Sequence, residues 1–194
     1  MNPLKEAPEI LLREGDSSLL LYKRSFCRYE MENLIERIAW RQNKIRFFGK
    51  EYDEPRLTAW YGPAYCYSGI QWPEKSMPEF LLEISRELSE QFSINFNSVL
   101  LNYYRDGNDS MGWHSDNERE MDTHCIASIS LGESRIFALR KGTSGKSLRT
   151  VLHHGDLLVM FHLQEEWQHS IPKQPRLKGP RLNMTFRRII SNKD

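Results

Sequence analysis

The chain has 194 residues, of which 27% are charged and 11% aromatic, and its formal net charge at pH 7 is +1. This length allows one domain with a sizeable core, and the aromatic content excludes a disordered chain. No apolar stretch is long enough to cross a bilayer, and the first residues lack a basic segment followed by an apolar one. We therefore expect neither a membrane span nor an export signal.

Cysteine usage and charge distribution narrow the class of protein further. Cys27, Cys66 and Cys125 are widely spaced and include no Cys-x-x-Cys pair, which argues against a disulfide scaffold or a zinc ribbon. We expect a reducing compartment, namely the cytoplasm, or the nucleus in a eukaryote. Residues 135–188 hold eleven Lys/Arg against three Asp/Glu. Such a segment is either an anion-binding surface, for example for a nucleic-acid backbone, or ordinary scattered surface charge.

The first part of the chain predicts an irregular arm, a helix and a strand-rich stretch. Residues 1–26 indicate the arm, with one short apolar strand at Leu19–Tyr22. Apolar side chains at helical spacing predict an amphipathic helix over about Arg28–Trp40. Pro and Gly punctuate the stretch from Ile45 to about Trp72, which predicts hairpins.

A second helix and a series of strands complete the predicted elements. Ser76 and Glu79 form a capping box before an amphipathic stretch that ends at Phe92. Seven short strands follow: Ser98–Tyr104, Ile126–Leu131, Arg135–Leu139, Ser147–Leu152, Leu157–Phe161, Gln168–Ile171 and Arg181–Ile189. This spacing is typical of a β-sandwich or barrel. We expect a mostly β (α+β) fold, with the helices covering one side.

The last predicted strand has an unusual polar face. Because side chains alternate along a strand, Arg181, Asn183, Thr185 and Arg187 share one side, opposite an apolar side. The ordinary interpretation is a core face and a solvent face. However, arginine binds planar carboxylates through two parallel hydrogen bonds, so two arginines on one face could bind a small diacid.

Candidate metal ligands lie upstream of this strand. His114 and Asp116 are two residues apart on an extended segment, so they point the same way and can bind one ion. His154 and Asp156 repeat the pattern, but a turn that opens the following apolar strand explains them without a metal. His169 lies several strands downstream, and a jelly roll can bring such a strand beside the first.

Two histidines and one carboxylate leave three of six octahedral positions open, as in the facial triad of non-haem Fe(II) oxygenases. A bidentate 2-oxo acid would fill two positions and O2 the third. The two arginines would face the far carboxylate, and Asn102 and Tyr104, on one strand face, could add hydrogen bonds. The alternative from another class is a non-catalytic β-sandwich binding module whose His/Asp cluster is structural or holds zinc.

Six motifs occur together and in order. They are Asn102-Tyr103-Tyr104, His114-Ser115-Asp116-Asn117-Glu118, Ser128-Ile129-Ser130-Leu131-Gly132, His154-Gly155-Asp156-Leu157-Leu158, Trp167-Gln168-His169 and Arg181-Leu182-Asn183-Met184-Thr185-Phe186-Arg187. The set resembles the AlkB-type Fe(II)/2-oxoglutarate dioxygenases, which repair alkylated bases, from about Phe47 to Ile189.

The resemblance implies a single domain over residues 1–194. A double-stranded β-helix (jelly roll) core would span about 97–190, and a nucleotide-recognition lid about 45–75. The implied metal ligands are His114, Asp116 and His169, which together with Arg187 form the implied catalytic set. The implied 2-oxoglutarate contacts are Asn102, Tyr104, Arg181, Asn183 and Arg187.

Within the implied lid, Pro55-Arg56-Leu57-Thr58-Ala59-Trp60-Tyr61-Gly62 and Tyr65-Cys66-Tyr67-Ser68 resemble the duplex-repair branch, which includes the eukaryotic DNA-repair homologues. Tyr67 matches the aromatic residue that stacks on an extruded base, and Tyr65 and Glu118 match contacts to its polar edge. Phe48 matches a wedge that fills the gap in the duplex, and Arg140 a phosphate contact. Core or cross-strand packing remains open for the aromatic residues, as does an ordinary solvated loop for Arg140.

The implied activity is oxidative demethylation of 1-methyladenine and 3-methylcytosine in DNA, a direct reversal of damage. It would use Fe(II), 2-oxoglutarate and O2 and release formaldehyde, succinate and CO2. Asn117 departs from the family pattern, because several relatives carry a second acidic residue there. The alternative within the family is an oxygenase that acts on RNA or protein. We expect a monomer, with DNA or RNA as partner and no membrane.

Overall fold

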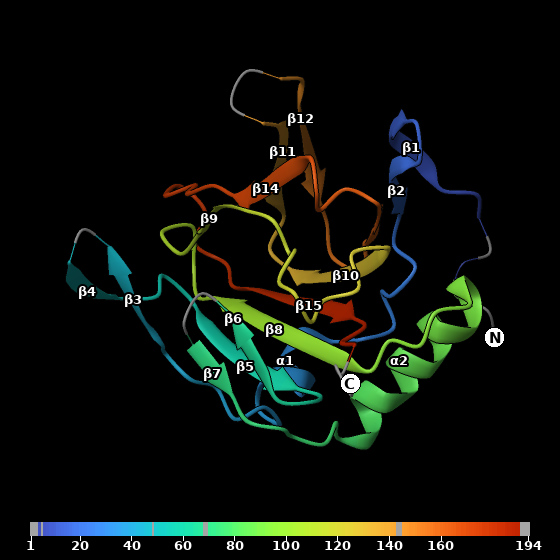
Figure 1. The fold of residues 1–194 in the computed structure, drawn as a ribbon. Helices are drawn as coiled ribbons and strands as arrows, with labels where there is room; N and C mark the ends of the chain where they lie inside the picture. Colours follow the sequence, from blue (N-terminus) through green and yellow to red (C-terminus); the bar gives the residue numbers. More distant parts are fainter. Residues whose placement is uncertain (1–3, 5, 48, 68–69, 143–144, 191–194) are drawn as a thin grey trace.

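The computed structural model describes residues 4, 6–47, 49–67, 70–142 and 145–190, without the side chains of residues 46–47, 65–67 and 70. Two antiparallel sheets face each other (Figure 1). The larger contains, in spatial order, β1 (Glu9–Glu14), β2 (Ser17–Tyr22), β13 (Leu157–Phe161), β10 (Cys125–Gly132), β15 (Arg181–Arg187), β8 (Ser98–Tyr104) and β5 (Leu57–Tyr61). The smaller contains β12 (Ser147–Leu152), β11 (Arg135–Lys141), β14 (Trp167–Ile171) and β9 (Met111–His114).

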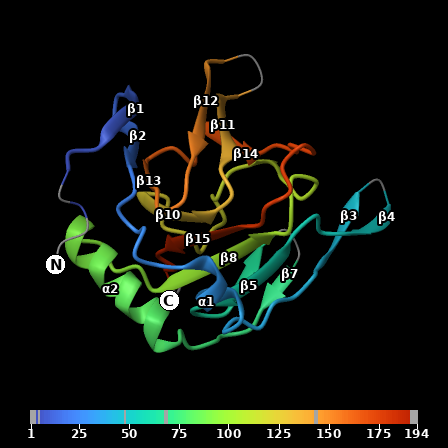
Figure 2. The same cartoon turned by 180° about the vertical axis from the view of Figure 1, so that it is seen from behind.

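Two helices cover the outer face of the larger sheet, α1 (Met31–Ile35) and α2 (Glu79–Phe92) (Figure 2). Leu182 and Met184 of β15 share one buried cluster with Leu81 and Ile84 of α2 and Leu34 of α1. This arrangement confirms the predicted mostly β fold with helices on one side, in the form of a double-stranded β-helix. Within the described ranges, no helix has the length and apolar character needed to span a membrane.

The inner face of the larger sheet packs against the smaller sheet through a second apolar cluster, to which Leu100, Ile126 and Trp167 belong. The polar side chains of β15 also point inward, and Arg181 and Arg187 are buried. The ordinary interpretation of this face as solvent-exposed is therefore wrong. Buried guanidinium groups require partners, so this face indicates a functional interior.

Two small hairpins each form a separate two-stranded sheet, and the first of them projects from the rest of the molecule (Figure 1). They are β3 (Lys44–Phe47) with β4 (Lys50–Asp53), and β6 (Tyr65–Tyr67) with β7 (Ile70–Trp72). The prediction of hairpins over residues 45–72 is thus correct at both ends. It is wrong for β5, which pairs with β8 in the larger sheet because its side chains are buried there.

Other predicted boundaries also differ from the structure. The N-terminal arm is a β1–β2 hairpin with a bulge between Ile10 and Leu12. Helix α1 is much shorter than predicted, and the Trp40 indole donates to the Ile35 carbonyl where the helix ends. The predicted capping box is wrong, because α2 begins after Pro78 without a side-chain cap.

The larger sheet has two outer strands, β1 and β5. On β1, Glu14 forms ion pairs with Lys141 and Lys146 at 2.6 and 2.8 Å. On β5, the backbone of Thr58 exchanges two hydrogen bonds of 2.8 Å with the backbone of Arg41. Both outer edges are therefore partly occupied by other segments of the chain.

Candidate active site

The structure brings the three predicted metal ligands together. Strands β9 and β14 are neighbours, and their register places His114 directly opposite His169, with ring centroids 4.1 Å apart. Asp116 follows β9 and is fully buried. One potential ligand atom from each residue lies within 4.8 Å of the others, and no second group of this kind occurs among the described residues.

Neighbouring groups fix the orientation of these ligands. The Nδ1–H of His114 donates to the Gly112 carbonyl at 2.9 Å, because a carbonyl can only accept. Its Nε2 is therefore the unprotonated nitrogen, and it lies 3.9 Å from Oδ1 of Asp116. The backbone N–H of Asp116 donates to Gln164 Oε1 at 3.0 Å, which holds the segment after β9 in place. Histidines that bind a metal usually donate their other ring N–H to a carbonyl or carboxylate, as His114 does here.

The protonation states suit a cation. Burial lowers the pKa of His114. Burial is also the main reason why the pKa of His169 falls to about 3. Burial alone would raise the pKa of Asp116, but the charge of the Arg187 guanidinium brings it below its ordinary value. At neutral pH the site thus presents two neutral imidazoles and a carboxylate, the forms that a divalent metal requires.

One oxygen of the buried carboxylate is left for a ligand. Oδ2 of Asp116 accepts from Nη2 of Arg187 at 2.7 Å, and both side chains are at most 2% exposed. Oδ1 has no hydrogen-bond partner among the described residues. Because an unpaired buried carboxylate oxygen is costly, a cation between Oδ1 and the imidazole nitrogens fits this donor set.

The same cavity contains an incompletely paired arginine. Nη2 of Arg181 donates to Ser130 Oγ at 2.8 Å, whereas its Nε and Nη1 have no partner among the described residues. Burial lowers the pKa of Arg181 to about 10, so the group stays charged at neutral pH. Asn183 donates to Ser128 Oγ, also at 2.8 Å, and Asn102 lines the same cavity. The cavity therefore combines three candidate metal ligands with a cation suited to a carboxylate.

Comparison with known proteins places this geometry in a family. The family model described as the 2OG-Fe(II) oxygenase superfamily matches residues 22–187. The chain belongs to the 2OG-Fe(II) oxygenase superfamily. Its relatives are of the AlkB type, and the predicted Fe(II), 2-oxoglutarate and O2 are the cofactors and co-substrates that this family implies.

Two named relatives show the similarity. The chain is 37% identical over 172 residues to "Alpha-ketoglutarate-dependent dioxygenase alkB homolog 3" of Mus musculus, covering 82% of this chain and 60% of that protein. It is 37% identical over 177 residues to "DNA oxidative demethylase ALKBH2" of Homo sapiens, covering 84% and 68%. This oxygenase thus spans about 60% of the length of the alkB homolog 3 relative.

A solved structure supports the fold. OsALKBH1 aligns with a TM-score of 0.65 and 16% identity, covering 91% of this chain and 99% of that one. At this identity the similarity concerns the fold alone, and it agrees with the two facing sheets of this oxygenase.

Two buried arginines of the oxygenase were not predicted as site residues. Nε of Arg56 donates to Asn102 Oδ1 at 2.8 Å, and its Nη2 forms an ion pair with Glu54, also at 2.8 Å. Arg135 lies over the ring of Tyr104, with 5.4 Å between guanidinium carbon and ring centroid. Arg56 follows Pro55, which is typical of a turn, and Arg135 is the first residue of a strand. Residues at such positions are usually exposed, so the sequence does not indicate that these two arginines are buried.

The predicted substrate contacts of the oxygenase are less completely described. Phe48 lies outside the described residues, as do the side chains of Tyr65 and Tyr67, although their backbone forms part of β6. Glu118 is half-buried, two residues beyond Asp116. Arg140 lies 4.3 Å from the Trp113 ring and donates to Gln168. Neither Glu118 nor Arg140 lines the cavity described above.

The second His-x-Asp pattern is a turn, as its sequence suggests. The Asp156 carboxylate accepts from the backbone N–H groups of Arg24 and His153 at 2.9 and 2.8 Å. Gly155 has φ +80°, and a Cβ there would lie 2.3 Å from Cys27 Sγ. These contacts explain the pattern as backbone capping.

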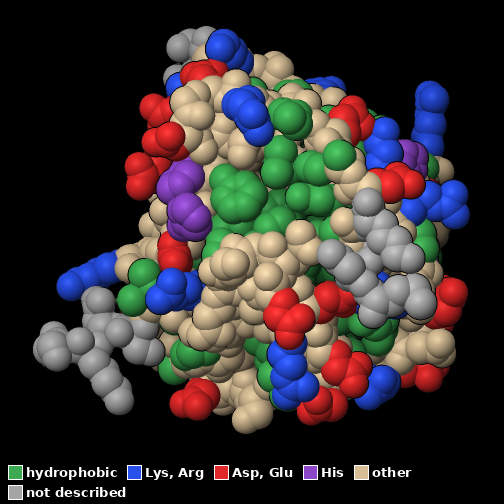
Figure 3. All heavy atoms as spheres, turned by 90° about the vertical axis from the view of Figure 1, so that its right-hand side faces the viewer, with side chains coloured by type: hydrophobic (Ala, Val, Ile, Leu, Met, Phe, Trp, Pro, Cys, Tyr) green, Lys and Arg blue, Asp and Glu red, His purple; other side chains and the backbone are tan. Residues whose placement is uncertain are grey.

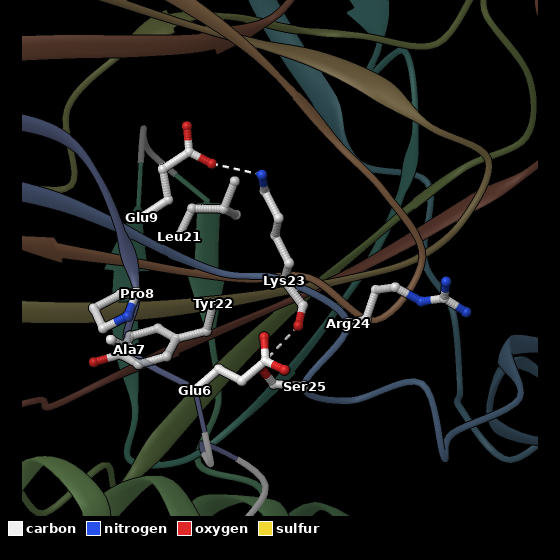
Figure 4. A pocket seen from close by; sticks show the side chains of 9 residues that line it. All are labelled: Glu6, Ala7, Pro8, Glu9, Leu21, Tyr22, Lys23, Arg24 and Ser25. Atoms are coloured by element: carbon white, nitrogen blue, oxygen red, sulfur yellow. Dashed lines mark hydrogen bonds and ion pairs between the residues drawn. The ribbon is translucent and has the colours of Figure 1, made fainter.

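A larger hollow lies on another face, between the N-terminal segment and the end of β2 (Figure 4). Its lining includes Glu9 and Lys23, which form an ion pair at 2.7 Å. Figure 3 shows hydrophobic side chains gathered on the face that carries this region, bordered by charged groups. No group of candidate metal ligands among the described residues lies in this hollow, so it does not offer the chemistry of the cavity described above.

Proposed function

We propose that this oxygenase removes N-methyl groups from nucleobases in DNA, with 1-methyladenine and 3-methylcytosine as substrates. The observation that carries the proposal is the buried cavity in which His114, Asp116 and His169 meet beside Arg181. The relatives support the substrate class, because one of them is named a DNA oxidative demethylase.

The proposed roles follow from the geometry. His114, Asp116 and His169 would hold Fe(II), and Arg187 would keep the Asp116 carboxylate ionised and oriented. Arg181 would bind the far carboxylate of 2-oxoglutarate, and polar side chains would surround the co-substrate: Asn102, Tyr104, Asn183 and Arg187. When bound, Fe(II) with 2-oxoglutarate and O2 supplies the oxidation that hydroxylates the methyl group, with succinate and CO2 as co-products. The hydroxymethyl base then loses formaldehyde.

We also propose the division into a core over about 97–190 and a nucleotide-recognition lid over about 45–75, within one domain. The β3–β4 and β6–β7 hairpins support this division, because each forms a separate two-stranded sheet. In the lid, Tyr67 would stack on the extruded base, which offsets part of the cost of unstacking it. Tyr65 and Glu118 would contact its edge, Phe48 would fill the gap, and Arg140 would bind a phosphate.

The test is demethylation of oligonucleotides that carry one 1-methyladenine or 3-methylcytosine, with mass detection of the repaired base and of formaldehyde. Turnover should require both Fe(II) and 2-oxoglutarate, and His114→Ala and Asp116→Ala should reduce it to background. His154→Ala is the matched control, because it alters the second His-x-Asp pattern outside the cavity. Wild-type turnover by either ligand variant would refute the assignment.

The same panel decides the substrate. Single- and double-stranded DNA and the matching RNA are compared at equal concentration. Repair confined to RNA would overturn the DNA proposal while leaving the oxygenase chemistry intact. Turnover of 2-oxoglutarate that requires Fe(II), without repair of any oligonucleotide, would indicate another substrate class, such as protein.

A further inference from the structure

Arg135, the first residue of β11, is a buried cation without an acidic partner. It is 1% exposed, and its guanidinium donates to three backbone carbonyls: Asp106 at 3.1 Å, Asp109 at 2.8 Å and Pro172 at 2.9 Å. The nearby Asp109 carboxylate is bound by Arg105 at 2.8 Å. No ion pair to Arg135 occurs among the described residues, and burying an arginine without one is costly.

The position of Arg135 connects it to the proposed co-substrate pocket. Its guanidinium carbon lies 5.4 Å from the ring centroid of Tyr104, and that of Arg181 lies 5.2 Å from the same ring. Tyr104 and Arg181 are also direct partners in the β8–β15 register. Tyr104 and Arg181 line the cavity, whereas Arg135 does not. The Tyr104 ring is therefore contacted both by an arginine that lines the pocket and by one that does not.

The charges at this end of the cavity are unbalanced. Asp116 is the only acidic residue in the cavity lining, and it is paired with Arg187. Neither Arg181 nor Arg135 forms an ion pair with a carboxylate among the described residues, although the Asp106, Asp109 and Glu133 carboxylates lie near enough to favour the charged form of Arg135. A 2-oxo acid that binds the metal through its oxo group and adjacent carboxylate can supply one only if it carries a second carboxylate at its far end.

We propose that Arg135 is a positioning and specificity residue. It holds the Tyr104 ring against Arg181 and adds a second positive charge, so the pocket favours a 2-oxo diacid over a 2-oxo monoacid of equal chain length. This inference rests on the proposed function, because it takes the cavity as the 2-oxoglutarate site. Arg135 thereby contributes to the selectivity for the far carboxylate without lining the pocket.

The test is calorimetric binding to Mn(II)-loaded protein, which needs no turnover. The two ligands are 2-oxoglutarate and 2-oxopentanoate, which has the same chain length but lacks the far carboxylate. Arg135→Met keeps an unbranched apolar side chain and removes the charge. We expect the affinity for 2-oxoglutarate to fall about tenfold, as for loss of one charge in a partly buried site. The affinity for 2-oxopentanoate should change less than about twofold, because it has no group for this charge.

Two further variants separate positioning from general loosening. Arg105→Gln loosens the same loop at Asp109 without touching the Tyr104 ring, and it should preserve the preference for the diacid. Arg135→Lys keeps the charge but loses the planar fork, and should weaken 2-oxoglutarate binding about threefold, less than Arg135→Met does. If Arg135→Met does not fold, Arg135→Lys tests the proposal instead. If Arg135→Lys binds 2-oxoglutarate as tightly as the wild type does, the positioning role is overturned.

The remaining outcomes are also decisive. Equal weakening of both acids in Arg135→Met would reveal a purely structural residue and overturn the inference. The inference would also be overturned if Arg105→Gln lost as much of the preference for the diacid as Arg135→Met does. Failure of the wild-type protein to bind 2-oxoglutarate with Mn(II) would instead refute the proposed function itself, and with it the pocket on which this inference depends.

Discussion

At the scale of single residues, Asp116 shows how the oxygenase keeps a charge inside its core. The carboxylate is fully buried, and the neighbouring Arg187 guanidinium holds its pKa below the ordinary value despite burial. The imidazoles of His114 and His169 are uncharged at neutral pH because burial lowers the pKa of both. The metal-free protein therefore has a site whose stability depends on pH.

We predict that the metal-free protein loses stability as the pH falls from about 7 to 4. An unfolded histidine titrates near pH 6.5, whereas His169 in the folded protein has a pKa of about 3, so the unfolded state binds more protons in this window. His114 acts in the same direction, and Asp116 contributes only below about pH 4. Each histidine can contribute up to ~1.4 kcal/mol per pH unit.

The measurement is urea unfolding in the presence of a chelator between pH 7.5 and 4.5. His169→Gln should show a shallower dependence of the unfolding free energy on pH than the wild type. His124→Gln is the control, because His124 is exposed and away from the cavity. Parallel curves for wild type and His169→Gln would show that His169 does not titrate abnormally.

At the scale of elements, the site depends on how two loops lock the strands together. Gly107 precedes β9, and its N–H and C=O bond to Leu177 O and Gln174 N at 3.1 and 2.8 Å. A Cβ at Gly107 would lie 1.9 Å from the Gln174 carbonyl oxygen, a backbone atom that cannot easily move. The segment before β9 is thus held directly against the segment that joins β14 to β15.

We predict that Gly107→Ala destabilises the protein by about 1–3 kcal/mol, the usual cost of overpacking. Because the displaced loop leads into β9, the affinity for Mn(II) should fall as well. Gly112→Ala is the matched control, since no atom lies within 4 Å of the added Cβ, although Gly112 is nearer to His114. Chemical denaturation and metal titration of both variants make the comparison. If Gly107→Ala and Gly112→Ala have equal free energies of unfolding, the close contact between the two loops does not contribute to stability.

The sequence predicts those elements whose pattern is local. The alternation in β15 indicates its two faces, and the seven strands after residue 97 are confirmed in place. It does not reveal β1, whose charged ends obscure the alternation, nor β9, which is only four residues long. The meeting of His114 with His169 depends on the pairing of β9 with β14, which a jelly-roll topology allows and the resemblance to a family implies, but which no local pattern specifies.

The burial of polar side chains is the feature of this fold that is hardest to predict from sequence patterns. The basic excess of residues 135–188 could be surface charge or an anion site, yet Arg135, Arg181 and Arg187 are all at most 2% exposed. The unusual polar face of the last strand drew attention to Arg181 and Arg187, but nothing in the local sequence distinguishes Arg135 from exposed arginines such as Arg149. The burial of all three follows from the sheet topology, which the alternation of one strand does not specify.

At the scale of the whole molecule, ligands should stabilise the fold, because the cavity joins both sheets. We predict that Mn(II) and 2-oxoglutarate together, at about 100 times their dissociation constants, add ~2.7 kcal/mol. For a chain of this size, that corresponds to a rise in Tm of about 5–10 °C. EDTA should reverse the rise and His114→Ala should abolish it, whereas His154→Ala should retain it. Thermal unfolding measures the effect, and an unchanged wild-type Tm would contradict the assigned ligand set.

The outer strands of the larger sheet have a consequence for behaviour at high concentration. A free strand edge recruits strands from other copies, which leads to aggregation and fibres. Here the bulge between Ile10 and Leu12 and the paired charge of Glu14 interrupt one edge. The backbone of Arg41 occupies part of the other at Thr58. Neither edge offers a continuous template, so the sheet resists growth by addition of a foreign strand.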